Sequence, residues 1–427
     1  MTTMTASPSA QNYRVRAIVA ASIGNALEWF DFAVYGFFAV TMAKLFFPRG
    51  DDTVALLANL LLFGVPFFIR PLGALLLGDF ADRRGRRAAL TLTIGLMMLG
   101  TALIAFAPTY AMVGVLAPLV ILVARLIQGF SAGGEFGSAT AFLAEQNPAQ
   151  RGFFASWQFA SQGLTTILAT AFGATLASNL TVEQMDSWGW RAPFIFGLLI
   201  GPVAWYIRTR LEETVEYKAV VASHTPLMDT FKNNGSQLLI GIGLVVLSTV
   251  GTYTISLYMP TYAVRQLGLP ASGSYMAALL TGAVQLVCVP IVGALSDRIG
   301  RTPIAMASAL LMILIIYPLF TWLVAAPTIG TLLVVQAIGG LLMAGYLGGL
   351  PALLAELFPT RLRTTGLSIS YAFAVAIFGG GAPFLNTWLI QATGSNLVPS
   401  YYLIFAAAIS LIALLAARSQ TARPLQP

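Results

Sequence analysis

The chain has 427 residues, of which 57% are hydrophobic and only 9% are charged, and its mean hydropathy is +0.80. Soluble domains carry roughly 25% charged residues, so this composition excludes a soluble globular domain and predicts an integral membrane protein. The formal net charge of +7 requires no nucleic-acid partner, because the distribution of basic residues follows membrane topology, as described below. The single cysteine, Cys288, lies in an apolar run, so no disulfide framework is expected.

Twelve apolar runs are each long enough to cross a bilayer as a helix, and they are continuous, without the two-residue alternation of barrel strands. The first run is longer than the apolar core of a secretory signal and no small-residue cleavage site follows it, so we expect an uncleaved span. The sequence therefore predicts an all-α membrane protein with spans at 17–43, 54–78, 88–107, 112–144, 152–178, 191–207, 236–263, 272–295, 303–325, 329–356, 364–390 and 399–417.

One long polar break, 208–235, divides the twelve predicted spans six and six. We therefore expect an N-terminal six-helix bundle in residues 1–207, a cytoplasmic linker in 208–235 and a C-terminal six-helix bundle in 236–427. In this assignment 17 of the 23 Lys and Arg residues fall in breaks on one side of the membrane. The positive-inside rule places both termini in the cytoplasm of a protein that spans the cell (inner) membrane several times.

The two halves share a repeated loop, because "GDFADRRGRR" (78–87) aligns with "GALSDRIGRT" (293–302). A second pair, "LAEQNP" (143–148) and "LAELFP" (354–359), has a similar offset, which indicates duplication of a six-helix unit in parallel orientation. The glycine lets two helix ends approach, and the aspartate can cap a helix or pair with arginine. We expect these loops to act as latches between the halves through Gly78, Asp82, Arg83, Gly85, Arg86, Gly293, Asp297, Arg298, Gly300 and Arg301.

These loops and the layout of six plus six spans resemble the major facilitator superfamily. Within it the chain is similar to the metabolite:proton symporter family, and in two segments most similar to its citrate and tricarballylate transporters. The resemblance implies symport by alternating access, with citrate, 2-oxoglutarate and related carboxylates, or proline and betaine, as substrates. It is carried by "GNALEWFDFAVYG" (24–36), "RPLGALLLGDFADRRGRR" (70–87), "RLIQGFSAGGEFG" (125–137), "WGWRAPF" (188–194), "TYTISLYMPTYAV" (252–264), "ALSDRIGRTP" (294–303), "AELFPTRLRTTG" (355–366) and "AIFGGGAPFLNTWLIQATG" (376–394).

Ionisable residues inside membrane spans are costly and are functional candidates by default. The ionisable residues that lie in the interior of a predicted span are all in the first half. Spans 7 to 12 contain neutral polar groups and aromatic rings there. At 100° per residue, one polar stripe on the first span contains Asn25, Glu28, Asp31 and Tyr35. Two carboxyl groups one helical turn apart in a low dielectric do not readily ionise at the same time, because burial and mutual repulsion both oppose it. We therefore expect Glu28 or Asp31 to carry the coupling proton.

Arg125 lies in the middle of the fourth span and stays protonated, and its planar fork suits a carboxylate. A switch follows: an ionised acid occupies Arg125, and protonation of that acid frees Arg125 for an anionic substrate. The alternative is a permanent structural ion pair between Asp31 and Arg125. The other predicted substrate-binding residues are neutral, with hydroxyl and amide groups suited to carboxylate oxygens: Asn25, Gln128, Gln158, Gln162, Tyr35, Tyr253 and Tyr371.

The sequence thus predicts a secondary active transporter, a proton-coupled symporter of a di- or tricarboxylate such as citrate. The alternatives are uptake of 2-oxoglutarate, sodium-coupled citrate symport, or uptake of a zwitterion such as betaine or proline with Trp29 and Tyr35 facing its cation. The sequence has one histidine and one cysteine, and it contains no metal-ligand cluster and no catalytic triad pattern. We therefore expect that the protein is not an enzyme and has neither a cofactor nor a metal site. We expect a monomer whose partners are the carboxylate substrate and membrane lipid, with no nucleic acid.

Overall fold

The computed structural model describes residues 18, 22, 25–26, 29–48, 50–84, 86–133, 135–210, 234–359 and 362–418. For helical residues 78–79, 81–84, 86–90, 135, 138, 200 and 203–210 the description covers the backbone alone. Within these ranges the chain is helical and contains no strand. Most of the predicted linker, 208–235, lies outside the described residues, and so does Glu28.

Within the described residues, helices lie in each of the twelve predicted ranges, which agrees with the predicted all-α class. The first predicted span contains two helical pieces, Trp29–Phe37 and α2 (Ala39–Phe46), bent by 71° at Phe38. The first half continues with α3 (Asp52–Arg84), α4 (Arg86–Ala105), α5 (Tyr110–Val113), α6 (Leu116–Ser131), α7 (Glu135–Glu145), the 3-10 turn η1 (Pro148–Gln150), α8 (Arg151–Asn179), α9 (Val182–Ser187), η2 (Gly189–Arg191) and α10 (Ala192–Arg210).

The second half begins with an α-helix that becomes a π-helix and then an α-helix again. Its elements are α13 (Gly235–Gly251), the π-helix η3 (Thr252–Tyr258), α14 (Met259–Leu267), α15 (Ala271–Ile299), α16 (Arg301–Ala325), α17 (Ile329–Leu347), α18 (Leu350–Leu357), α19 (Arg363–Ala374), the π-helix η5 (Val375–Gly379), α20 (Ala382–Thr393) and α21 (Val398–Arg418). Among the described residues, seven helical runs are long and apolar enough to cross a membrane, or eight if the bent pair at Phe38 counts as one span.

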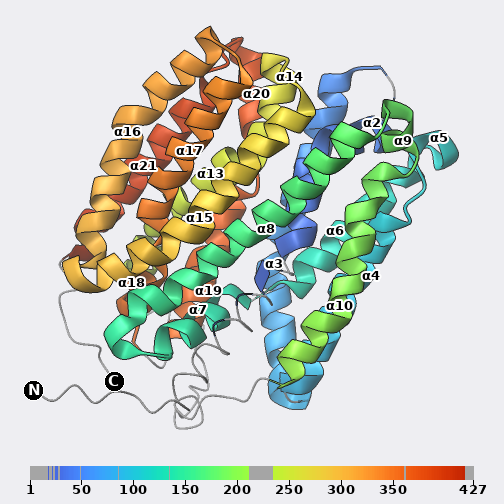
Figure 1. Ribbon diagram of the computed structural model, residues 1–427. Coiled ribbons are helices and arrows are strands. Elements are labelled where there is room, and N and C mark those ends of the chain that lie inside the picture. Colours follow the sequence, from blue (N-terminus) through green and yellow to red (C-terminus); the bar gives the residue numbers. More distant parts are fainter. Residues whose placement is uncertain are drawn as a thin grey trace, which may run out of the picture.

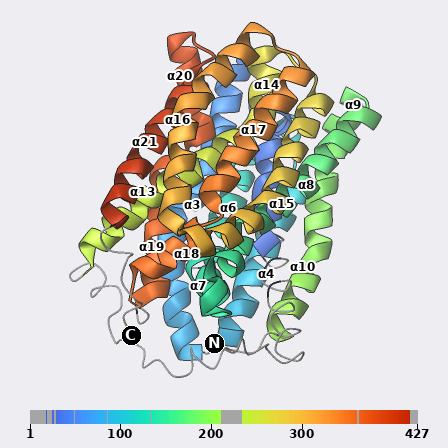
Figure 2. The ribbon, with the colours of Figure 1, turned by 60° about the vertical axis from the view of Figure 1, so that its left-hand side comes forward.

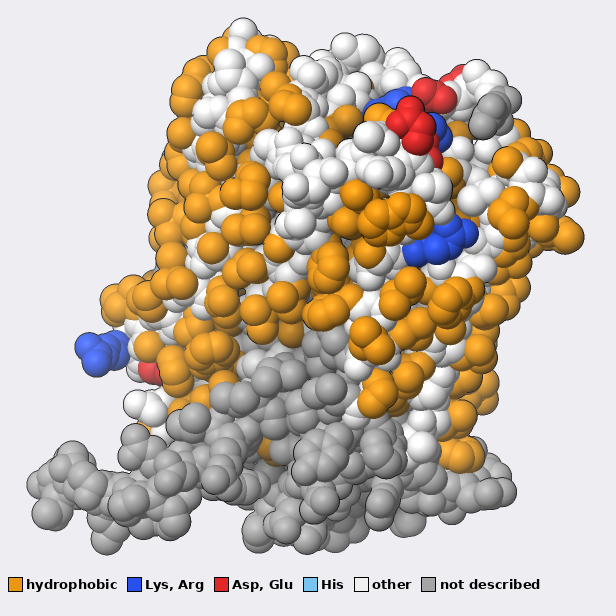
Figure 3. Space-filling model, turned by 45° about the vertical axis from the view of Figure 1, so that its right-hand side comes forward, with side chains coloured by type: hydrophobic (Ala, Val, Ile, Leu, Met, Phe, Trp, Pro, Cys, Tyr) orange, Lys and Arg blue, Asp and Glu red, His pale blue; other side chains and the backbone are white. Residues whose placement is uncertain are grey.

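The molecule consists of two helical bundles side by side, with the second half on the left in Figure 1 and the first half on the right. The elements α2, α9 and α14 lie at one end, which we call the upper end, and α7 and α18 lie at the lower end (Figures 1 and 2). Hydrophobic side chains cover most of the described side wall visible in Figure 3, and charged groups gather near its upper rim. Large exposed hydrophobic side chains in the described residues include Leu199, Leu314 and Ile412, as expected for contact with lipid.

Helices α8 and α15 form a close seam between the halves, and they lie side by side in Figures 1 and 2. A Cβ atom on Gly163 would lie 2.7 Å from the carbonyl oxygen of Gly282, and one on Gly282 would lie 2.8 Å from that of Gly163. Gly152 and Gly293 meet in the same way nearer the lower end. Small residues let helix backbones approach in membranes, so this seam brings side chains of both halves to a common centre.

Candidate functional site

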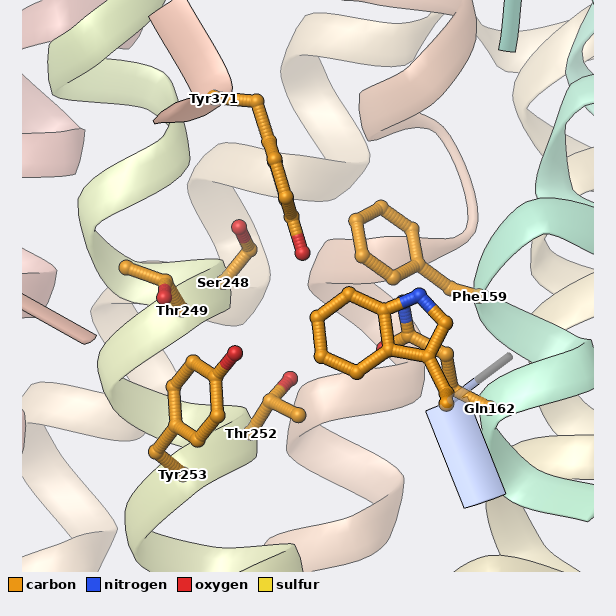
Figure 4. A pocket seen from close by; sticks show the side chains of 8 residues that line it. Phe159, Gln162, Ser248, Thr249, Thr252, Tyr253 and Tyr371 are labelled. Atoms are coloured by element: carbon orange, nitrogen blue, oxygen red, sulfur yellow. The ribbon is translucent and has the colours of Figure 1, made fainter. Parts of the chain in front are cut away.

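A small cavity lies between the halves, with about 210 Å³ of atom-free space. The first half contributes Trp29 and, from α8, Phe159 and Gln162, and the second half contributes hydroxyl groups from α13, η3 and α19 (Figure 4). The lining residues from the second half are Ser248, Thr249, Thr252, Tyr253 and Tyr371.

Several polar groups at the cavity lack a hydrogen-bond partner within the described ranges. They are the Gln162 side-chain nitrogen Nε2 and the hydroxyl groups of Thr249 and Tyr253, and all three atoms are buried. Buried polar groups are normally paired, so these are candidates for binding ligand oxygens. Of the predicted neutral ligands, Gln162, Tyr253 and Tyr371 line the cavity. The Tyr371 ring also stacks on Phe136, with 3.6 Å between ring centroids.

Arg125 is fully buried beside the cavity but does not line it. Its guanidinium donates to the Gln128 side-chain oxygen at 3.0 Å and to the Phe63 carbonyl oxygen at 3.1 Å. The guanidinium carbon lies 4.4 Å from the ring centroid of Tyr35 and 4.9 Å from that of Phe32. The aromatic faces and the two acceptors hold the cation in place in a region without water-exposed surface.

Asp31 and Arg125 form no direct ion pair; a chain of two polar side chains joins them. Gln128, which accepts from Arg125, donates through Nε2 to the Thr101 hydroxyl oxygen at 3.2 Å, and this hydroxyl donates to Oδ2 of Asp31. The other carboxylate oxygen, Oδ1, is buried without a partner in the described part of the chain. It faces Gly197 of α10, where a Cβ atom would lie 2.5 Å from it.

Thr101 is a site residue that sequence analysis missed. It is one of several hydroxyl residues in the apolar sequence of α4, and no spacing rule distinguishes it. Its contact with Asp31 joins residues 70 positions apart. Gly100 allows this geometry, because a Cβ atom there would lie 2.9 Å from the Ala124 carbonyl oxygen of α6.

Three predicted substrate ligands are occupied by hydrogen bonds within the first half. Asn25 donates to the Gln158 carbonyl oxygen at 3.0 Å and to the Ser161 hydroxyl at 2.7 Å, and Gln158 donates back to the Asn25 side-chain oxygen at 3.1 Å. The Tyr35 hydroxyl donates to Asn59 at 2.6 Å. These contacts tie the first helix to α8 and α3, so in this state Asn25, Gln158 and Tyr35 position the helix that carries Asp31.

Arg70 of α3 is a second buried cation close to the cavity, and only 6% of its surface is exposed. Its guanidinium carbon lies 4.8 Å from the ring centroids of Trp29 and Phe67 and 5.1 Å from that of Phe32. Its nitrogen atoms Nε and Nη2 are buried with no hydrogen-bond partner among described residues. Phe32 therefore lies against both buried arginines, and Trp29 lies against Arg70 while it lines the cavity.

The first copy of the predicted latch lies at the junction of α3 and α4. The side chains of Asp82, Arg83 and Arg86, together with Gly78 and Gly85, fall outside the described side chains, so the structure leaves their predicted role open. The second copy, at the junction of α15 and α16, is described in full.

In the second copy, the Asp297 carboxylate accepts from the N–H groups of Gly152 and Phe153 at 2.8 and 3.0 Å. These N–H groups begin α8 of the other half, so the acid binds the positive end of a helix across the seam. Arg301 donates to Asp297 at 3.0 Å. Gly300 lies between α15 and α16 with φ of +103°, a conformation that favours glycine. The Arg298 side chain is exposed.

The repeated "LAE" segments form reciprocal ion pairs at the same lower end. Glu145 of the first half pairs with Arg363 of the second at 2.9 Å, and Glu356 of the second pairs with Arg151 of the first at 3.5 Å. Arg301 joins Glu356 at 3.2 Å. Each duplicated glutamate therefore binds an arginine of the opposite half.

The upper end is also closed by contacts between the halves. Arg265 lies 3.7 Å from Asp52, and the Tyr275 hydroxyl donates to the Phe37 carbonyl oxygen at 2.9 Å. Contacts between the halves therefore lie on both sides of the cavity. Exchange of a ligand with either side of the membrane requires one set of these contacts to break while the other persists.

Comparisons with known proteins agree with this architecture. The model of the sugar (and other) transporter family matches residues 17–233 and again 212–418. The citrate-proton symporter of Klebsiella pneumoniae is 37% identical over 404 residues, which cover 94% of this chain and 91% of that protein. A proline/betaine transporter of Salmonella typhimurium is 34% identical over 425 residues, which cover 96% of this chain and 85% of that protein.

Among solved structures, the xylose transporter of E. coli in a partially occluded inward open conformation matches with a TM-score of 0.75 at 16% identity. The match covers 97% of this chain and all of that one. At this identity the likeness concerns the fold, and it confirms the predicted twelve-helix arrangement. The predicted relationship to membrane transporters is also confirmed.

Proposed function

Because the chain belongs to the sugar (and other) transporter family of the major facilitator superfamily, we propose that it is a proton-coupled symporter of a di- or tricarboxylate such as citrate. The observation that carries this proposal is the buried chain from Asp31 through Thr101 and Gln128 to Arg125. It joins one acid to one cation in a part of the membrane where each ionised group is costly alone.

Coupling follows from the charge of this chain of residues. With Asp31 ionised, the acid and Arg125 balance each other. When Asp31 takes up a proton, the network gains a net positive charge, and an anion entering the cavity restores neutrality. Proton binding and anion binding then favour each other, as reciprocal linkage requires.

Arg70 supplies the additional charge that a polycarboxylate needs. Two of its buried nitrogen atoms have no partner among the described residues, and neither do the buried polar groups of Gln162, Thr249 and Tyr253; all of them lie at or behind the cavity wall. A substrate that displaces the rings of Trp29 and Phe67 would meet this cation directly. Two arginines and several neutral donors match a ligand with two or three carboxyl groups better than one with a single carboxyl group.

A zwitterion such as betaine or proline is the second candidate. Trp29, Phe159, Tyr253 and Tyr371 all line the cavity, and aromatic faces bind quaternary ammonium groups. A proline/betaine transporter is among the relatives described above. The cation of such a substrate would compete with Arg70 for the face of Trp29, which favours the carboxylate.

The remaining features of the proposal concern topology and partners. The chain is a multi-pass membrane protein, and we place the lower end, with its many basic residues, in the cytoplasm together with both termini. The coupling ion is the proton, with sodium as the alternative, and transport needs no other cofactor. The functional unit is a monomer in the cell (inner) membrane.

The test is uptake of labelled citrate into proteoliposomes with an imposed inward proton gradient. We expect accumulation that collapses with a protonophore, persists without sodium, and is inhibited by unlabelled tricarballylate. Inhibition by betaine alone, with no uptake of citrate or 2-oxoglutarate, would establish the zwitterion alternative. Accumulation that requires a sodium gradient would replace the proton with sodium.

A further inference from the structure

The Thr101 hydroxyl faces two hydrogen-bond acceptors and one donor, and it is 1% exposed. It donates to Oδ2 of Asp31 and also lies 3.0 Å from the Met97 carbonyl oxygen of its own helix, while Gln128 Nε2 donates to it. A hydroxyl has one hydrogen and two lone pairs. Its hydrogen therefore serves either Asp31 or Met97, but not both fully.

The two choices match the two protonation states of Asp31. With Asp31 ionised, the hydroxyl donates to Oδ2 and accepts from Gln128. With a proton on Oδ2, the acid becomes the donor, and the hydroxyl turns its hydrogen to the Met97 carbonyl while it still accepts from Gln128. The Thr101 hydroxyl has both a donor and an acceptor as partners in either state, so the change of direction leaves Thr101 itself with no unpaired group.

We propose that Thr101 is the positioning residue for the coupling proton, and that its hydroxyl reverses direction each time Asp31 gains or loses that proton. The proposal rests on the proposed function in taking Asp31 as the proton site. The proton comes from water on one side of the membrane, forms one O–H bond at Oδ2, and leaves to water on the other side. No other covalent bond changes.

The packing around this group supports a role specific to Thr101. Gly197 leaves room for Oδ1, and Gly100 lets α4 approach α6 so that Gln128 reaches the hydroxyl. The described charged and titratable groups that face this network are Arg125 on α6, Arg70 on α3, Tyr253 on η3 and Tyr35 on the helix of Asp31. The described side chains of α4 and α10 contribute none, and Glu28 lies outside the described residues.

The first measurement is a pH titration of the Asp31 carboxyl by infrared difference spectroscopy on the purified full-length protein in a Glu28→Gln background. The Asp31→Asn variant identifies the protonated-carboxyl band, because it removes that band. We expect Thr101→Val to shift the band to higher frequency and its midpoint by about half to one pH unit to the alkaline side. The ionised acid loses a stronger hydrogen bond than the neutral acid does.

Thr101→Ser keeps the hydroxyl and should restore the midpoint and frequency. Thr170→Val is the matched control, because the Thr170 hydroxyl is also buried, but its partners among the described residues are the backbone oxygens of Thr166 and Ile167. The proposal would be overturned if Thr101→Val left the midpoint and the band frequency equal to those of the Glu28→Gln protein that retains Thr101. A Thr101→Ser variant as altered as Thr101→Val would also overturn it.

The second measurement compares gradient-driven uptake with exchange across pH. We expect Thr101→Val to shift the pH profile of uptake to the alkaline side and to reduce exchange less than uptake, because exchange needs no proton release. Equal loss of both activities with an unchanged pH profile would mean a structural role and would contradict the proposal. The infrared titration needs no substrate, so it separates failure of this inference from failure of the carboxylate assignment.

Discussion

The two halves of the molecule share a duplicated loop and a common helical plan, but they carry different chemistry. The first half buries Asp31, Arg70 and Arg125, whereas the described cavity residues of the second half are hydroxyl-bearing side chains such as Thr249 and Tyr253. The contrast teaches that duplication preserved the loop sequence and the reciprocal glutamate–arginine pairs, while the interior diverged. We infer that the first half couples the proton to charge and the second half recognises neutral features and shape.

The largest effect that tests this contrast is expected from Arg125. Arg125→Gln should reduce both uptake and exchange by about 100-fold, because the bound anion loses the buried cation that balances its charge. Removing one partner of a buried charge pair costs about 2–5 kcal/mol. Labelled-substrate uptake and counterflow measure both activities. Arg125→Lys keeps the charge but loses the planar fork, and it should recover only part of the activity. Normal exchange in Arg125→Gln would contradict the division between the halves.

Asp31→Asn should separate the two activities. We expect gradient-driven uptake to fall more than about tenfold, which corresponds to about 1.4 kcal/mol, while exchange persists because asparagine mimics the protonated acid. Counterflow with and without a proton gradient measures this difference. Loss of exchange to the same degree would favour a permanent structural role for Asp31.

Arg70 distinguishes ligands by their charge. Arg70→Gln should raise the KM for a tricarboxylate by about tenfold or more, since hydrogen bonds to charged groups contribute about 1.5–3 kcal/mol, and should affect a dicarboxylate less. Arg70→Lys is the matched control that keeps the charge. Inhibition constants for tricarballylate and succinate provide the readout, and equal changes for both ligands would count against a substrate role.

The second half should respond more weakly. Tyr253→Phe and Thr249→Val each remove one unpaired hydroxyl at the cavity, and each should raise KM several-fold, or about 1 kcal/mol. The pH profile of uptake should not move, because among the described residues neither hydroxyl forms a hydrogen bond with a member of the chain from Asp31 to Arg125. A displaced pH profile in either variant would extend the coupling machinery into the second half.

The smallest effect is expected at the reciprocal ion pairs of the lower end. Glu145→Gln and Glu356→Gln each leave one arginine of the opposite half without its acid, and partly exposed pairs of this kind contribute at most about 1 kcal/mol. The double variant should increase lower-end access to a thiol reagent at a cysteine introduced beside the cavity in a Cys288→Ser background. Unchanged access would mean that the Asp297 contact with α8 is sufficient for closure.

The sequence by itself determined the membrane class, the helical ranges, the duplicated plan and the ionisable residues of the interior. Composition, span length and periodicity are local properties of a chain in a bilayer, so they can be read without coordinates. For the same reason the buried Asp31 and Arg125 were identified as candidates from their cost in the membrane.

Only the tertiary structure decided which of these residues meet. It separates Asp31 from Arg125 by Thr101 and Gln128, ties Asn25 to Gln158, and surrounds Arg70 with aromatic rings. These contacts join helices that are distant in sequence, and they depend on how closely glycines such as Gly100 and Gly197 let those helices approach. A hydroxyl such as that of Thr101 becomes a functional group only when packing brings an acid within hydrogen-bond distance of it.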